Sequence, residues 1–158
     1  MQLHLLLKYL NTLYICTVIF SKTCQAGLKS IAFLASIKNT AKKYSAKELA
    51  KAVEENDHTL GKMLQLLVKH EIISSLKGPN GGFFIEGKQR QIPVIRIVEV
   101  IDGKFAFNQC AMGFNKCSEK KPCAFHGEFK KSRKIIEVLL IEKKISDLGK
   151  ANSLFNEI

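Results

Sequence analysis

The strongest constraint on how this chain can fold is a turn-forming run, Gly-Pro-Asn-Gly-Gly, at residues 78–82. Glycine reaches backbone conformations with positive φ and proline fixes its own φ, so the run favours a tight reversal of the chain. Two short β-prone segments flank it, residues 72–77 and 83–85. The sequence therefore predicts a β-hairpin over residues 72–85.

Three helices are predicted before the hairpin. Apolar residues recur at steps of three and four over residues 20–35, which predicts a helix with one apolar face. Ser45 and Glu48 have the spacing of a capping box and predict the start of a short helix that runs through Val53. Asp57 is predicted to cap a third helix, whose apolar side carries Leu60, Met63, Leu64, Leu67 and Val68.

The order of these elements indicates a fold class. Two short helices separated by a tight turn outline a helix-turn-helix, and a glycine-rich hairpin directly after them makes a winged helix. A generic α+β domain with a hairpin is the alternative. The order, the element lengths and the charge favour the winged helix.

The remaining chain predicts two helices separated by a loop. Residues 92–101 form a short helix, with Pro93 near its first turn and Gly103 past its end. Residues 108–122 are predicted to be a loop. A long helix then runs from His126 to about residue 144, with an apolar stripe of Phe129, Ile136, Leu139 and Leu140. No other predicted element covers this stripe, so we expect it to pair with its copy in a second chain.

The first residues are treated separately from the rest of the chain. Residues 1–18 are apolar, but Lys8 interrupts them and no small-residue cleavage site follows, so a signal peptide or a membrane span fits poorly. We expect an N-terminal extension, either an amphipathic helix or the product of a start codon placed too early. The predicted organisation is this extension, a winged helix-turn-helix at 19–90, and a loop with a long helix at 91–158.

The composition indicates a polyanionic partner. Twenty-five Lys and Arg against fourteen Asp and Glu give a formal net charge of +11. A small domain this basic usually binds nucleic acid, because each neutralised phosphate releases counterions. An anionic lipid surface and a merely solvated face are the alternatives, and the helix-turn-helix favours DNA.

Three of the five cysteines are crowded together. Cys110, Cys117, Cys123 and His126 fall within seventeen positions, whereas Cys16 lies in the extension and Cys24 on an apolar helix face. Clustered cysteines in a chain without export signals indicate metal or redox chemistry in the cytoplasm. Structural zinc usually takes cysteines two to four residues apart, and the gaps here are six and five residues, which favours an iron–sulfur cluster. Zinc and a metal-free redox thiol site stay open at this point.

Four segments together resemble a known family. These are residues 20–24, residues 45–50, the Lys-Gly-Pro-Asn-Gly-Gly-Phe run at 77–83, and the loop from Cys110 to His126. From about Ile19 to Leu148 the chain resembles the Rrf-two family of bacterial winged-helix regulators, in the branch of the iron–sulfur cluster biogenesis regulator and the nitric-oxide-sensitive repressor. The resemblance implies a homodimer of winged-helix heads joined through a long dimerisation helix, so the fold is expected to be mainly α with a small β-hairpin.

The resemblance also implies a ligand set. Cys110, Cys117 and Cys123 match the cluster cysteines, and His126 matches the histidine ligand of a two-iron two-sulfur cluster. A four-iron four-sulfur cluster occurs in the nitric-oxide-sensing branch. The first cysteine gap is six residues where the biogenesis regulator has five. Residues 59–62, Thr-Leu-Gly-Lys, replace a commoner aromatic stretch, so the operator sequence cannot be transferred.

The expected function is a cytoplasmic transcriptional repressor, not an enzyme, because paired carboxylates, a nucleophile elbow and a phosphate loop are not found. The third helix would enter the major groove and the wing would approach the minor groove of a palindromic operator. The expected DNA contacts are Lys22, Ser45, Lys47, His58, Thr59, Lys62, Lys77, Gly78, Asn80 and Gly81. A small iron–sulfur electron-transfer protein and a zinc-stabilised DNA-binding module are the alternatives.

Overall fold

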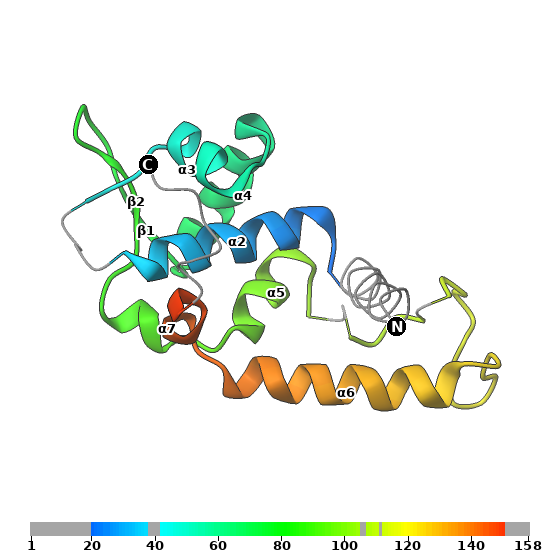
Figure 1. Ribbon diagram of the computed structural model, residues 1–158. Coiled ribbons are helices and arrows are strands. Elements are labelled where there is room, and N and C mark those ends of the chain that lie inside the picture. Colours follow the sequence, from blue (N-terminus) through cyan, green and yellow to red (C-terminus); the bar gives the residue numbers. More distant parts are fainter. Residues whose placement is uncertain (1–19, 38–41, 105–106, 111, 151–158) are drawn as a thin grey trace, which may run out of the picture.

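The computed structural model describes residues 20–37, 42–104, 107–110 and 112–150. Within them the chain forms helices and one small antiparallel sheet, as predicted (Figure 1). Helices α3 and α4 and the hairpin lie on one side of α2, and the long helix α6 lies on the other side in this view. The predicted extension at 1–18, with Cys16, lies outside the described residues.

The helix-turn-helix is formed by α3 (Ala46–Val53) and α4 (Asp57–Lys69), packed against α2 (Lys22–Ser36). The predicted capping box at the start of α3 is confirmed: Ser45 Oγ accepts from the Glu48 N–H, and Glu48 accepts from the Ser45 N–H. The predicted cap of α4 is wrong by one residue. Asn56 caps the helix, because its Oδ1 accepts from the N–H groups of His58 and Thr59 at 3.1 and 3.2 Å. Asp57 is instead the first helical residue.

The hairpin is formed by β1 (Ser74–Leu76) and β2 (Gly82–Phe84). Strand β1 is shorter than the predicted segment 72–77, and β2 begins and ends one residue before the predicted segment 83–85. Gly78 has φ 111°, and the Gly81 N–H donates to the Gly78 carbonyl at 2.9 Å, which closes the turn. The hairpin is attached to the segment before α3 by two hydrogen bonds between the backbones of Phe83 and Tyr44, at 2.8 and 3.1 Å. At Gly82 a Cβ atom would lie 2.7 Å from the Tyr44 backbone, so the close approach requires glycine there.

The C-terminal part differs from the prediction in its details. After the 3₁₀ helix η1 (Lys88–Gln91), α5 spans Ile95–Ile101 and begins later than predicted, because residues 92–94 pair with the segment that follows the next helix. Helix α6 spans His126–Glu142, and a short helix that was not predicted, α7 (Ile145–Leu148), follows it. The connection is held by hydrogen bonds from the Val94 N–H to the Lys143 carbonyl and from the Ile145 N–H to the Ile92 carbonyl.

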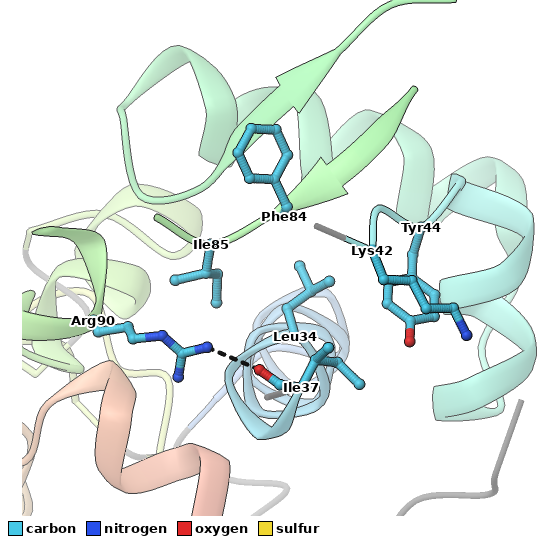
Figure 2. A pocket seen from close by; sticks show the side chains of 7 residues that line it. All are labelled: Leu34, Ile37, Lys42, Tyr44, Phe84, Ile85 and Arg90. Atoms are coloured by element: carbon cyan, nitrogen blue, oxygen red, sulfur yellow. Dashed lines mark hydrogen bonds between the residues drawn. The ribbon is translucent and has the colours of Figure 1, made fainter. Parts of the chain in front are cut away.

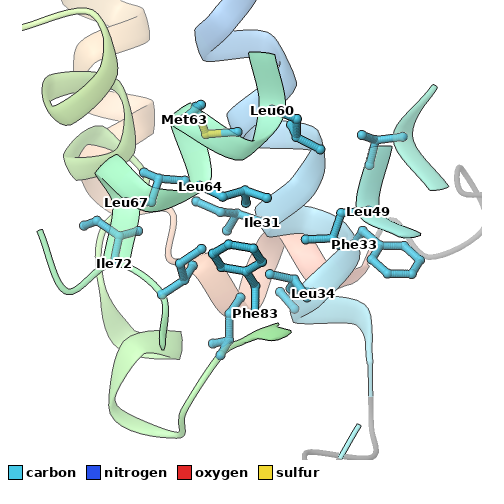
Figure 3. Close-up of a cluster of buried hydrophobic side chains, with 14 of the residues drawn as sticks. Ile31, Phe33, Leu34, Leu49, Leu60, Met63, Leu64, Leu67, Ile72 and Phe83 are labelled. Carbon is cyan, nitrogen blue, oxygen red and sulfur yellow. The ribbon is translucent and has the colours of Figure 1, made fainter. Parts of the chain in front are cut away.

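The core lies where α2, α3 and α4 meet the base of the hairpin (Figure 3). Its most deeply buried large side chains include Ile31, Leu49, Leu60, Leu64, Leu67, Ile72, Ile73, Ile97 and Ile145. Gly27 allows α2 to approach α5 closely, because a Cβ there would lie 2.5 Å from Ile101 Cδ1. Cys24 is completely buried, as its predicted place on the apolar face of this helix implies.

Helix α6 contains no fully buried residue. Leu140 packs against the core, whereas Ile135, Val138, Leu139 and Ile141 are exposed apolar side chains. The predicted stripe is therefore divided, since Leu140 is covered within the chain and Leu139 is not. Among the described helices, none is long and apolar enough to span a membrane.

Candidate metal centre and DNA-binding surface

The three clustered cysteines come together in the loop between α5 and α6. The sulfur atoms of Cys110, Cys117 and Cys123 all lie within 4.8 Å of one another, and those of Cys110 and Cys123 are 3.9 Å apart. Short backbone turns fold the loop: the Gly113 N–H donates to the Cys110 carbonyl, and the Cys117 N–H donates to the Phe114 carbonyl. The residues that the sequence groups into one site therefore lie together in space.

His126 lies beside these thiols at the first turn of α6. Its Nδ1 is 3.2 Å from Cys117 Sγ, and its side chain is 16% exposed. On its other side, Nε2 is 3.4 Å from Oε1 of Glu119, which accepts a hydrogen bond of 2.5 Å from Lys130 Nζ. Sequence reasoning missed Glu119. The sequence offers only a weak sign of it, an acidic residue between two candidate ligands with Lys130 one helical turn beyond His126.

The thiols of the loop differ in their acidity. Hydrogen bonds from the backbone near Phe114 and Met112 stabilise the Cys110 thiolate, so the pKa of Cys110 is lowered. The backbone N–H of Cys123 also favours the Cys117 thiolate, but desolvation and the neighbouring thiols outweigh it, so the pKa of Cys117 is raised. A metal binds thiolates, and binding at this loop would therefore release protons.

Arg133, in the middle of α6, contacts the cysteine loop. Its Nη1 donates to the carbonyl of Gln109, the residue before Cys110. Its Nε is buried and has no hydrogen-bond partner within the described part of the chain. A buried donor on a cationic side chain that contacts the cysteine loop suits a group that is negatively charged, as a metal bound by three thiolates would be.

The start of the loop is fastened to the start of α2. The Ser21 N–H donates to Asp102 Oδ2 at 3.0 Å, and Ser21 Oγ donates to Asp102 Oδ1. Beyond Asp102, the ring of Phe107 packs edge-on against Phe20, with centroids 6.5 Å apart. The segment that leads to Cys110 is therefore anchored at the helix that begins with Lys22.

Nine of the ten predicted DNA contacts are on exposed positions. His58, Thr59 and Lys62 are exposed on the first turns of α4, and Lys22 and Lys47 are exposed near the starts of α2 and α3. In the wing, Lys77, Gly78 and Asn80 are exposed and Gly81 is partly buried. Ser45 is exposed too, but its hydroxyl donates to Glu48 Oε2 at 2.7 Å. A role for Ser45 in phosphate binding would require that hydroxyl to turn.

A shallow pocket lies near the C-terminal end of α2 (Figure 2). It is lined by Leu34, Ile37, Lys42, Tyr44, Phe84, Ile85 and Arg90. Arg90 donates to the carbonyls of Ala35 and Ile37 at 2.8 and 3.0 Å, which satisfies carbonyl groups at the helix end. The arginine of this pocket thus stabilises α2.

The family model Rrf2, described as an iron-dependent transcriptional regulator, matches residues 20–151. This chain belongs to the Rrf2 family. This Rrf2 protein is 29% identical over 133 residues to an HTH-type transcriptional regulator of Aquifex aeolicus (strain VF5), and the match covers 83% of this chain and 91% of that one. Rrf2 proteins are transcriptional regulators that bind DNA.

Solved structures show the same fold. CymR (YrzC), the global cysteine regulator of B. subtilis, aligns with a TM-score of 0.62 and 19% identity, covering 84% of this chain and 96% of that chain. T. potens IscR aligns with a TM-score of 0.60 and 20% identity, covering 87% of this chain and 91% of that chain. The winged-helix architecture predicted from the sequence is thereby confirmed.

Proposed function

We propose that this Rrf2 protein is a sequence-specific DNA-binding repressor that senses redox, iron or nitric oxide status through an iron–sulfur cluster. Cys110, Cys117, Cys123 and His126 would hold the cluster. The observation that carries the proposal is the convergence of three sulfurs within 4.8 Å of one another, with an imidazole nitrogen 3.2 Å from one of them. When bound, the cluster supplies a centre that responds to oxidants, iron supply and nitric oxide.

Two pairs of donor atoms lie at separations that suit metal binding, and the family resemblance favours a two-iron two-sulfur cluster, with a four-iron four-sulfur cluster as the alternative. Cys110 and Cys123 form one pair at 3.9 Å, and Cys117 and His126 form the other at 3.2 Å. Two ligands of one tetrahedral metal lie about 3.8 Å apart for two sulfurs and about 3.5 Å apart for a sulfur and a nitrogen. Each pair is thus close to the separation needed by one iron.

The exposed face of α4 and the wing support the DNA-binding part of the proposal. His58, Thr59 and Lys62 would approach base edges and phosphates in the major groove. Contacts with the phosphates and the minor groove would come from Lys22, Ser45, Lys47, Lys77, Gly78, Asn80 and Gly81. The head would comprise residues 19–90, and residues 91–158 would form the cluster loop and the dimerisation helix.

The uncovered apolar side of α6 supports a homodimer. Ile135 is 70% exposed and Leu139 is 49% exposed, and a second copy of α6 would remove both from water. A symmetric dimer would bind a palindromic operator in the cytoplasm.

The first experiment is the visible absorption spectrum of anaerobically purified protein, with iron and acid-labile sulfide assayed on the same sample. A coloured protein with equal iron and sulfide supports the cluster, and the ratio to protein gives its type. A colourless protein that contains zinc would contradict the sensor and leave a zinc-stabilised DNA-binding module. The variant His126→Cys should retain the cluster longer, because protonation competes less with the metal.

The second experiment measures binding to genomic DNA fragments at several salt concentrations. The repressor requires salt-dependent, sequence-selective binding that changes when the cluster is removed. A coloured protein that does not bind DNA would instead be a small electron-transfer protein.

A further inference from the structure

A carboxylate outside the proposed ligand set contacts the histidine of the site. Glu119 Oε1 lies 3.4 Å from His126 Nε2 and accepts from Lys130 Nζ at 2.5 Å. Glu119 follows Cys117 by two residues in the loop, and Lys130 follows His126 by four residues in α6. The three side chains therefore connect the loop to the helix beside the thiols.

The two nitrogens of His126 face different groups. A neutral imidazole has one N–H and one lone pair, and the partner of one nitrogen selects which form the ring adopts. A carboxylate accepts hydrogen bonds only, so the N–H belongs on Nε2, which faces Glu119. The lone pair is then on Nδ1, which lies 3.2 Å from Cys117 Sγ.

We propose that Glu119, held by Lys130, is a positioning residue that fixes the tautomer and orientation of His126, so that Nδ1 is the nitrogen offered to the metal. The metal-binding part of this inference rests on the proposed function. The tautomer part concerns the metal-free protein and stands by itself.

Lys130 is required because Glu119 is exposed. The Glu119 side chain is 70% exposed, so without a partner it would lose little by turning into solvent. Lys130 Nζ and His126 Nε2 both contact the same Oε1 atom, so the ammonium group keeps that oxygen beside the ring. Partners of this kind orient metal-binding histidines and raise their basicity.

The chain offers a matched control. Glu128 forms a comparable exposed ion pair with Lys131 at 3.2 Å in the first turns of α6. Glu128→Ala therefore removes an ion-paired carboxylate from the helix that carries His126, while the contacts of His126 with Cys117 and Glu119 stay intact. Glu119→Gln keeps an acceptor oxygen but removes the charge that holds Lys130.

The first measurement uses reduced, metal-free protein and records nitrogen-15 NMR of the histidine rings at a pH where they are neutral. His126→Asn identifies the His126 signals. We expect the wild type and Glu128→Ala to show an N–H at Nε2, and Glu119→Ala to shift toward a mixture of both tautomers. Unchanged His126 signals in Glu119→Ala would overturn the proposal.

The second measurement follows the visible absorption of anaerobically reconstituted protein after addition of an iron chelator. Loss of a partner of this kind costs about 10- to 100-fold in metal affinity, so Glu119→Ala should lose its colour about 10- to 100-fold faster than the wild type. Glu119→Gln and Lys130→Ala should show smaller changes in the same direction, and Glu128→Ala should show none. Equal rates of colour loss for the wild type and Glu119→Ala would overturn the role of Glu119 in metal binding. A wild type that takes up no cluster would overturn the proposed function. In that case the NMR measurement alone would test whether Glu119 fixes the tautomer of His126.

Discussion

Raising the pH should destabilise the wild-type protein more than a variant that lacks Cys24. Burial, together with the nearby Asp102 carboxylate, raises the pKa of the Cys24 thiol from 9.0 to about 12. In the unfolded chain the same thiol ionises near its ordinary value. Between these two values the folded state holds a proton that the unfolded state has released, so the free energy of unfolding falls as the pH rises.

The size of the effect follows from the two pKa values. At about pH 8 both states keep the thiol protonated and the contribution is close to zero. At about pH 10 the unfolded state gains about 1.4 kcal/mol from ionisation, while the folded state gains almost nothing. The stability advantage of the wild type over Cys24→Ala should therefore shrink by about 1.4 kcal/mol between these pH values.

The assay is urea unfolding of metal-free protein under reducing conditions, at both pH values, for the wild type and Cys24→Ala. Ionisation of the lysines, tyrosines and loop cysteines is common to both proteins and cancels in the difference. Alkylation of the folded wild type gives a second readout, because the Cys24 thiolate should be about a thousandfold scarcer than that of an ordinary thiol. Stability differences that stay constant with pH would refute the reasoning.

Further predictions concern the helix cap, the core, the proposed DNA contact and the proposed dimer. Asn56→Ala should lower the free energy of unfolding by about 0.5–2 kcal/mol in urea, whereas Asn56→Asp, which keeps an acceptor, should change it little. Leu64→Ala should cost about 2–5 kcal/mol in the same assay, because it leaves a cavity in the core. Lys62→Ala should weaken DNA binding and reduce the slope of log affinity against log salt by about one, and an unchanged slope would exclude a phosphate contact. Ile135→Asp should convert dimers to monomers in sedimentation, whereas Lys131→Ala should not.

Local signals explain what the sequence could predict. The hairpin depends on turn residues at 78–82 and the start of α3 on the pair Ser45 and Glu48, so both are encoded within a few positions. The cap of α4 was misplaced because Asn56 and Asp57 both have side chains that can cap a helix. Only the backbone geometry, which puts Asn56 Oδ1 near two N–H groups, distinguishes them.

Contacts between residues that are distant in the chain explain which features the sequence could not predict. Helix α7 is short, and the burial of Ile145 depends on its packing against α2 and η1. The candidate ligands could be grouped because they are close in sequence, and their side chains lie close together in the structure. Glu119 was missed because an exposed acidic residue has no distinctive pattern until Lys130 and His126 are placed beside it.

The hydrogen bonds between Ser21 and Asp102 join residues that are 81 positions apart. Helices α2 to α5 and the hairpin all lie between these two residues in the sequence. The hydrogen bonds therefore join the two ends of the segment 21–102 and close it into a ring. Neither end of the ring can fray without breaking the same contact. The amide protons at the start of α2 and the end of α5 should therefore exchange with solvent in a single opening event, which makes the segment from α2 to α5 one cooperative unit.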